Sequence, residues 1–478
     1  MQKQHTCHAA PFWAQAFCLA FLGGCAHYTP KPIAPENTLQ QLQARRLTDP
    51  DVLNAVRNAS PGTAPGEPLQ SWDRAQLLLA ALQLNHGLSQ ARAQLTQATA
   101  AVKTAHAIQN PTVSLASEYD LAQAGEPTWL YGIGTSFLLD TFVSRRLRTS
   151  VAQSGVRGAQ ADFTDAIWTV RREVRAALLT VVMARRRVTL LEADVRQREQ
   201  LAQLAHRRVE AGESASPESG QADLELARSR AALEDARRVQ IDGLSKLAAA
   251  TGVSERAFDG LNLTWDDLDQ PASTDESSLA SARDRALLSR SDLARAIADY
   301  DTKELELKQQ TSAQYLQTAL GPGYTYDHGI RKATFNASFS LPIFNHNEGP
   351  IAEAVAAREV AGRHVLAVQA TVLNEIEGTS GAYSAALGAL QRVREQRITS
   401  ESLAESARRA LEVDASDRPT YLAAELTAST ERLAELDALD RAQQALGALE
   451  DALRMPLSGP ETRLVPLQNN IATPSESQ

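Results

Sequence analysis

Apolar and small residues recur at alternating spacings of four and three between Val170 and Val209, with only Arg198 breaking the series. A heptad pattern held over this length predicts one long helix packed in a coiled coil. The positions are Val170, Val174, Ala177, Val181, Ala184, Val188, Leu191, Val195, Ala202, Ala205 and Val209.

The same pattern returns 202 residues later, the offset that separates Val170 from Val372. Its positions are Val372, Ile376, Thr379, Tyr383, Ala386, Leu390, Val393, Arg397, Ala404, Ala407 and Leu411. We interpret the chain as an internal duplication with repeats at about 71–253 and 277–457, joined by a polar, acidic segment near 261–276.

Each repeat is predicted to supply a long antiparallel helical hairpin. The first helix runs over about 151–211 and would be about 90 Å long at 1.5 Å per residue. A turn at 209–217 leads into the returning helix. The second repeat has its long helix at about 351–411 and its turn at 411–419. We interpret the heptad seam as structural, since its alanines and valines let helices approach closely.

The segments before the long helices alternate with a period of two. Apolar side chains at Phe335, Ala337 and Phe339 are separated by polar ones, and similar rows lie near 112–121 and 131–139. This predicts strands within about 111–142 and 313–344. A fourth strand, within 314–326, is less clear, because Gly321-Pro322-Gly323 interrupts it.

A soluble sheet with one buried face would show the same alternation. No second layer is predicted to cover these strands, however, and their ~10 residues suit a tilted crossing of a bilayer. Strands in lipid must close into a barrel, and four cannot enclose a lumen. Three copies would give twelve transmembrane strands, and the loop at 122–128 would be an extracellular turn.

The helix and strand patterns together predict a mostly α fold with a small β part: a trimeric α/β-barrel of coiled-coil hairpins and four strands per protomer. Composition supports the helical part. Aromatic residues make up only 5% of the 478 residues, and the formal charge is −9. Abundant alanine favours helices. The acidic balance excludes the basic stripe of a nucleic-acid-binding protein.

All three cysteines, Cys7, Cys18 and Cys25, lie at the N-terminus. Residues 1–24 have the charged start and short apolar stretch of a signal peptide. They end in Leu22-Gly23-Gly24-Cys25, which resembles the lipobox of bacterial lipoproteins, in which the cysteine is acylated; the alternative is an ordinary secretory signal with an incidental cysteine. We therefore expect lipidation at Cys25, a lipid-anchored extended segment over 25–70, and a flexible tail over 458–478.

Catalytic chemistry finds no support in the residue pattern. The sequence contains no phosphate-binding Gly-Lys loop, no G-x-S-x-G and no H-E-x-x-H. The nine histidines are scattered, and a metal-contacting role for His346 in its polar loop is weakly supported, because site-building histidines usually come in pairs. We predict no enzyme activity, no cofactor and no metal site, so energy for transport would come from a partner.

The whole layout resembles the TolC family of outer-membrane efflux proteins. Individually weak motifs carry the resemblance, in this order: Cys25 followed by Tyr28–Pro32, then Asn110–Leu115, Arg208–Glu213 and Ser340–Phe344. The run Phe344–Gly349 looks most like the heavy-metal efflux branch and points weakly to cation export. Ala26 after the lipobox cysteine implies passage to the outer membrane.

The resemblance implies a homotrimer with a periplasmic helical tunnel, a periplasmic adaptor protein, and an inner-membrane pump such as an RND transporter. It places adaptor docking at the helical tips. The tip residues are Val209, Gly212, Glu213, Leu411, Asp414 and Ser416.

Some family members carry pore-facing aspartates just after the second turn, where this sequence has Thr420 and Ala423. Asp414 and Asp417 lie close by and are candidates for pore closure, but they could equally be solvated turn residues that form local hydrogen bonds. Asp414 also replaces the usual tip glycine, which leaves the conformation of the second turn open. The rival to a channel is a lipid-tethered periplasmic coiled-coil scaffold without a pore.

Overall fold

The computed structural model describes residues 28–59, 71–119, 121, 129–138, 142–273, 276–314, 317–327, 329–340 and 343–464. The signal peptide, Cys25 and residues 465–478 lie outside these ranges. The chain divides into two units, Met1–Arg45 and Arg46–Gln478. The described part of the first unit contains helix α2 (Pro35–Ala44), which starts on a proline at its first turn.

The second unit runs twice through the same order of helix, helix, strand, strand, helix, helix. The first series is α4 (Arg74–Leu84), α5 (His86–His106), β2 (Thr112–Tyr119), β3 (Trp129–Leu138), α6 (Phe142–Glu210) and α7 (Ser216–Thr251). The second is α8 (Glu276–Ser289), α9 (Ser291–Ser312), β5 (Gln317–Asp327), β6 (Ile330–Ser340), α10 (Glu348–Glu412) and α11 (Arg418–Leu453). The predicted fold class, mostly helical with a small sheet, is confirmed.

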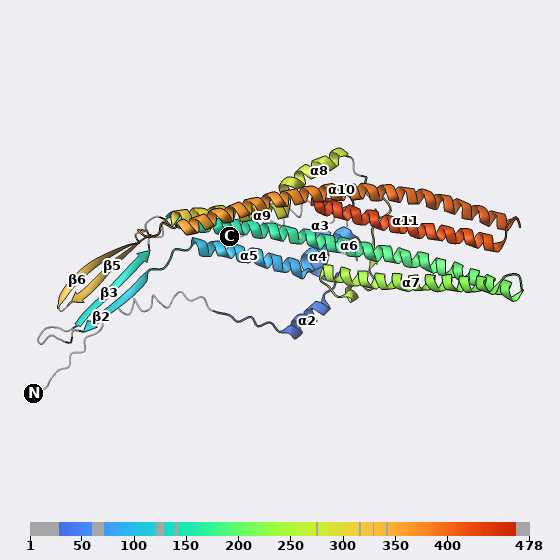
Figure 1. The fold of residues 1–478 in the computed structure, drawn as a ribbon. Coiled ribbons are helices and arrows are strands. Elements are labelled where there is room, and N and C mark those ends of the chain that lie inside the picture. Colours follow the sequence, from blue (N-terminus) through green and yellow to red (C-terminus); the bar gives the residue numbers. More distant parts are fainter. Residues whose placement is uncertain are drawn as a thin grey trace, which may run out of the picture. The chain divides into compact units, whose positions relative to one another are not determined.

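Helices α6 and α10 are 69 and 65 residues long, longer than the heptads alone predicted. Each packs along the helix that follows it (Figure 1). In the first seam, Leu191 and Val195 are packed with Leu233 and Ala236 of α7. All apolar positions of the first seam are buried except Val188 and Val209, which are half-buried. Among the helices described, none is both long and apolar enough to cross a membrane.

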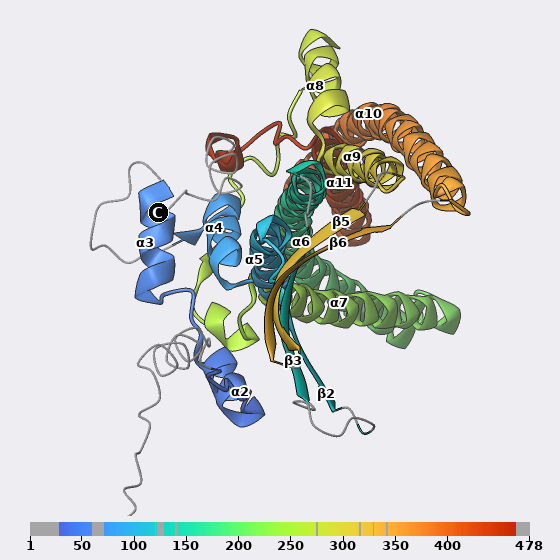
Figure 2. The ribbon, with the colours of Figure 1, turned by 90° about the vertical axis from the view of Figure 1, so that its left-hand side faces the viewer.

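The helices continue the order of the strands. The sheet is antiparallel with the order β2-β3-β5-β6. The helices joined to these strands pack in the matching order α5-α6-α9-α10. Viewed from the strand end, these four helices follow one another behind the sheet (Figure 2). The tips, where α6 meets α7 and α10 meets α11, lie at the far end of this unit.

Strand β5 passes straight through Gly321-Pro322-Gly323, so the expected interruption is wrong. Pro322 has no N–H to donate to β3, but the Thr135 hydroxyl donates to the Pro322 carbonyl at 2.8 Å. Gly321 is required beside it, because a Cβ atom there would lie 2.2 Å from the Thr135 carbonyl oxygen. The strand therefore continues through the proline by pairing with β6, while its register with β3 has no pair at Gly321 and Pro322.

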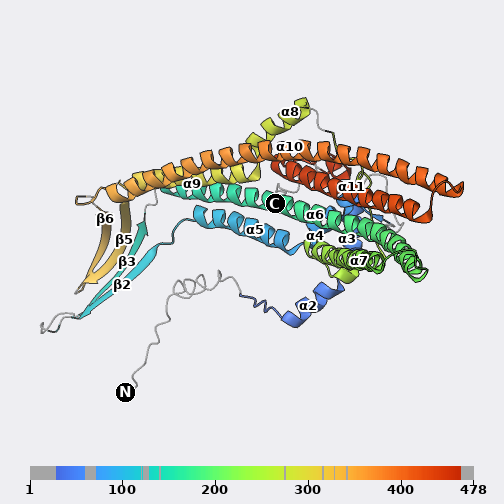
Figure 3. The same cartoon turned by 45° about the vertical axis from the view of Figure 1, so that its right-hand side comes forward.

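The two repeats are joined at the middle of the unit. Strand β1 (Ser71–Trp72) pairs in parallel with β4 (Asn262–Leu263), which lies in the joint between the repeats. Trp72 is completely buried there. Short 3-10 helices η1 (Glu255–Phe258) and η2 (Pro460–Arg463) flank this region. Helix α8 stands away from the long helices (Figure 3).

Two sequence predictions about the ends are wrong for the residues described. Residues 25–70 are not simply extended, since they contain α2 and a second helix, α3 (Pro50–Ala59), whose Val52 and Val56 are buried one turn apart. The tail is not flexible from residue 458: Glu461 is 1% exposed and Leu464 is 3% exposed. Helix α3 and η2 (Pro460–Arg463) both pack on α4, contacts that local patterns do not reveal.

Candidate functional site

The turns between the long helices are built alike in the two repeats. Gly212 has a φ of 71° and Asp414 a φ of 56°, so both lie in the left-handed region. The N–H of the next residue donates to the carbonyl five residues earlier at 2.8 Å in both turns. This bond is the mark of a Schellman helix ending. Asp414 therefore adopts the conformation usually reserved for glycine, and the second turn keeps the shape of the first.

Asp417 caps the helix that follows the second turn. Its carboxylate accepts a hydrogen bond from the Thr420 N–H at 2.9 Å. Hydrogen bonds from the Thr420 side chain and backbone lower the pKa of this exposed carboxyl. Ala215, the matching residue of the first repeat, makes no side-chain cap. The contact is the local bonding expected of a turn residue, while pore closure by Asp414 and Asp417 stays a prediction.

The other predicted tip residues form a surface on each turn. Val209, Leu411 and Ser416 are half-buried, and Glu213 is exposed. Val413 adds an apolar side chain that is 73% exposed at the second tip. In the described chain, the hydrogen bond nearest the tips that joins the two hairpins runs from Gln197 Nε2 to Glu425 Oε1 at 3.3 Å. The last turns of each hairpin are thus held mainly by their own helix pair.

The four-stranded sheet has two chemically distinct faces. Residues paired directly across antiparallel strands point to the same face, so the register sorts the side chains. The apolar face comprises Val113, Leu115, Ser117, Tyr119, Trp129, Tyr131, Ile133, Thr135, Phe137, Thr318, Leu320, Pro322, Tyr324, Tyr326, Arg331, Ala333, Phe335, Ala337 and Phe339. The polar face is mostly Gly, Ser, Thr and Asn, and carries all four glycines of the strands.

Aromatic side chains of different types lie at opposite ends of the apolar face. At the end far from the helices, the rings of Tyr119 and Trp129 lie 4.7 Å apart, and Trp129 stacks on Tyr131 at 5.6 Å. Towards the helices the aromatics are Phe137, Phe335 and Phe339. Tyr and Trp favour the headgroup level of a membrane, and Phe its hydrocarbon. This order fits a sheet that crosses a bilayer with its hairpin loops outermost.

Comparison with known proteins agrees with this geometry. Residues 77–253 match the family model of the outer membrane efflux proteins. Over these residues the chain is similar to the outer membrane efflux proteins. No curated protein matches its sequence.

The fold of the whole chain is similar to several solved structures. A membrane protein from Pseudomonas aeruginosa is 19% identical with a TM-score of 0.67, covering 83% of this chain and 99% of that one. The CmeC outer membrane channel of Campylobacter jejuni is 14% identical with a TM-score of 0.66, covering 85% and 94%. The outer membrane protein VceC of Vibrio cholerae is 18% identical with a TM-score of 0.64, covering 80% and 95%.

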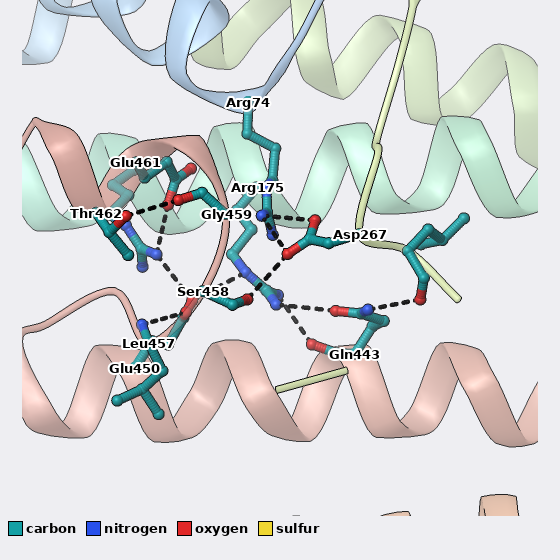
Figure 4. Close-up of polar contacts among 12 residues, drawn as sticks. Arg74, Arg175, Asp267, Gln443, Glu450, Leu457, Ser458, Gly459, Glu461 and Thr462 are labelled. Carbon is teal, nitrogen blue, oxygen red and sulfur yellow. Dashed lines mark hydrogen bonds and ion pairs between the residues drawn. The ribbon is translucent and has the colours of Figure 1, made fainter. Parts of the chain in front are cut away.

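The sequence analysis did not predict a buried charge cluster in the second unit (Figure 4). Arg171 of α6 contacts the carboxylates of Glu450 at 2.8 Å and Glu461 at 2.5 Å. The Arg175 side chain contacts Glu450 at 3.2 Å and donates to the Gln443 carbonyl at 2.9 Å. The cluster ties α6 of the first repeat to α11 of the second and to the C-terminal residues.

In this cluster the attraction between opposite charges outweighs the cost of burying them. Burial alone would lower the pKa of Arg171, but the carboxylates of Glu461 and Glu450 outweigh it and raise that pKa. Burial likewise works to raise the pKa of Glu450, and the neighbouring guanidinium groups hold it below its ordinary value. Asp451 is less well compensated, and burial raises its pKa to about 6. A charge without its partner would be costly here.

The same cluster fixes the joint and the C-terminal segment. Arg74 of α4 holds Asp267 of the joint at 2.8 Å, and the Ser458 hydroxyl donates to Asp267 at 3.0 Å. The Leu457 N–H donates to Glu450 at 2.7 Å. No local sequence signal marks these residues, because their partners lie far away in the chain; Arg171 and Glu450, for example, are 279 positions apart.

Proposed function

We propose that three copies of this chain close into an outer-membrane export channel, through which small molecules or metal cations pass without energy from the channel itself. The two-faced sheet carries the proposal. Its outer strands, β2 and β6, each pair on one side only in the described chain. Unpaired strand edges are not stable in lipid, so further copies must satisfy them. Twelve strands in a ring leave a lumen.

The helix order supports the same ring. If β6 of one copy pairs with β2 of the next, α10 of the first lies beside α5 of the second. Helix α10 presents apolar side chains along its strand-proximal part, with Val360 69% and Leu366 56% exposed. Helix α5 is rich in alanine and threonine, with Leu88 and Leu95 its buried residues. Large side chains on one helix and small ones on the other suit close packing.

The partners in this proposal are a periplasmic adaptor protein and an inner-membrane pump such as an RND transporter. Adaptor docking would use the tip residues Val209, Gly212, Glu213, Leu411, Asp414 and Ser416. Lipidation at Cys25 would hold the mature N-terminus to the outer membrane. Cation export follows only from the resemblance of Phe344–Gly349 to the heavy-metal branch.

The rival function is the lipid-tethered scaffold without a pore. Such a scaffold has no need for a face of exposed Tyr, Trp and Phe side chains. The test is a Cys25→Ala variant, secreted through an ordinary cleavable signal and analysed by fractionation and sedimentation in detergent. We expect it to remain in the outer membrane with the mass of three chains. A monomer that stays soluble without detergent would support the scaffold.

A further inference from the structure

The polar face of the sheet carries very few charges. Along the described strands it holds Glu118, Asp327 and Lys332. The remaining positions on this face are Thr112, Ser114, Ala116, Leu130, Gly132, Gly134, Ser136, Leu138, Ala319, Gly321, Gly323, Thr325, Ile330, Thr334, Asn336, Ser338 and Ser340. Among the described residues of this face, these three are therefore the ones that carry charge.

All three charges gather at the end of the sheet far from the helices. Glu118 is paired with Leu130, Leu130 with Asp327, and Asp327 with Ile330, so these residues form one row across the four strands. Lys332 lies one pleat further along β6 on the same face. The row sits beside the Tyr and Trp cluster of the apolar face, which is the expected headgroup level.

Two of the three charges neutralise each other. Lys332 Nζ lies 2.5 Å from Asp327 Oδ2 across the β5–β6 hairpin. Glu118 is exposed on edge strand β2, and in the described chain no cation pairs with it. Each copy thus contributes one uncompensated carboxylate at this level of the described polar face.

We propose that Glu118 gives the extracellular end of the channel a preference for cations over anions, and that Lys332 limits this preference by neutralising Asp327. The inference rests on the proposed trimeric barrel, which would set three Glu118 carboxylates around one lumen. Fixed charge of one sign lining a narrow passage concentrates ions of the opposite sign. Salt screens this effect within about 10 Å at 0.1 M and about 3 Å at 1 M.

The experiment measures reversal potentials of the full mature protein in planar bilayers under a KCl gradient around 0.1 M. Glu118→Gln should lower the permeability ratio of K⁺ to Cl⁻ about twofold, the size expected for charges acting across about 10 Å of screened water. Lys332→Gln should raise the ratio because it removes a positive charge from the polar face. Arg331→Gln is the matched control, because Arg331 adjoins Lys332 but belongs to the apolar face, and should leave the ratio unchanged.

Each outcome decides something. Wild-type protein that never conducts overturns both the channel and the inference. Conducting wild type and Glu118→Gln with equal ratios overturns the inference and leaves the channel standing. A shift in Arg331→Gln but none in Lys332→Gln would mean that the two faces are reversed, which also overturns it. Repeating the measurement at 1 M KCl should remove the differences, and differences that persist would exclude an electrostatic origin.

Discussion

The carboxylate of Asp417 accepts a hydrogen bond from the backbone N–H of Thr420 at 2.9 Å. The bond satisfies one of the amides that every helix leaves free at its start. Gly212 and Asp414 end the preceding helices in the same left-handed conformation, yet only the second tip has this cap. The two tips therefore share a backbone shape and differ in charge and in how firmly the returning helix begins.

Asp417→Ala should loosen the start of α11, because it removes the cap. We expect several-fold faster hydrogen exchange at Thr420 and its neighbours. Asp417→Ser is the informative companion, since serine also caps helices but carries no charge. If Asp417 helps to close the pore through its charge, both variants combined with Asp414→Ala should open more often in bilayers. If only the alanine form does so, capping explains the effect.

Asp414→Gly should stabilise the second tip, because a non-glycine residue in the left-handed region costs about 1 kcal/mol. Gly212→Ala should destabilise the first tip for the same reason. Local hydrogen exchange across each turn measures both effects. An unchanged second tip in Asp414→Gly would show that the Asp414 side chain makes a compensating contact.

Arg171→Met should destabilise the protein by about 3–5 kcal/mol, because it leaves Glu461 buried without its counter-charge and Glu450 with Arg175 alone. Arg171 and Glu450 side chains are 1% and 0% exposed. The exposed pair of Arg238 and Asp235 on α7 offers the control, and Arg238→Met should hardly change the thermal midpoint. Similar effects of the two substitutions would contradict a cluster that holds the repeats together.

Stability should also depend on pH through Asp451. Burial raises the pKa of its carboxyl from 3.8 to about 6. Between these values the folded chain holds a proton that the unfolded chain releases, so this group favours folding below about pH 4 and loses that contribution as pH rises through 6. Asp451→Asn should therefore be more stable than wild type at pH 7, by about 3 kcal/mol, and close to it near pH 4.

Thermal midpoints in detergent across this range test the effect of Asp451. Asp284, exposed on α8, provides a matched Asp→Asn control that should follow the wild type. A constant difference between Asp451→Asn and wild type from pH 4 to pH 7 would exclude titration of Asp451 as the cause.

Elements specified by local pattern could be predicted from the sequence. The seam from Val170 to Ala205 follows from heptad spacing alone, and the alternation around Phe335 locates a strand. Gly321-Pro322-Gly323 misled the analysis, because its tolerance depends on Thr135, a residue of another strand. Local residue preferences contain no information about a partner such as Thr135 on another strand.

The buried charge cluster could not be predicted from the sequence for a related reason. Arg171 and Arg175 adjoin the seam and look like solvated residues of a long helix, yet their partners come from α11 and η2. The ordered part of the C-terminal segment depends on the same contacts. In the tips, the positions could be predicted but the left-handed conformation of Asp414 could not, since aspartate adopts it only where the flanking helices demand it.

Conductance is the most direct test of the central claim that three copies form one channel. The mature protein, shown by sedimentation in detergent to contain three chains, would be added to a planar bilayer at a fixed voltage. The account predicts discrete, uniform current steps, one for each inserted trimer. Trimers or monomers that enter the membrane fraction but never carry current would contradict it.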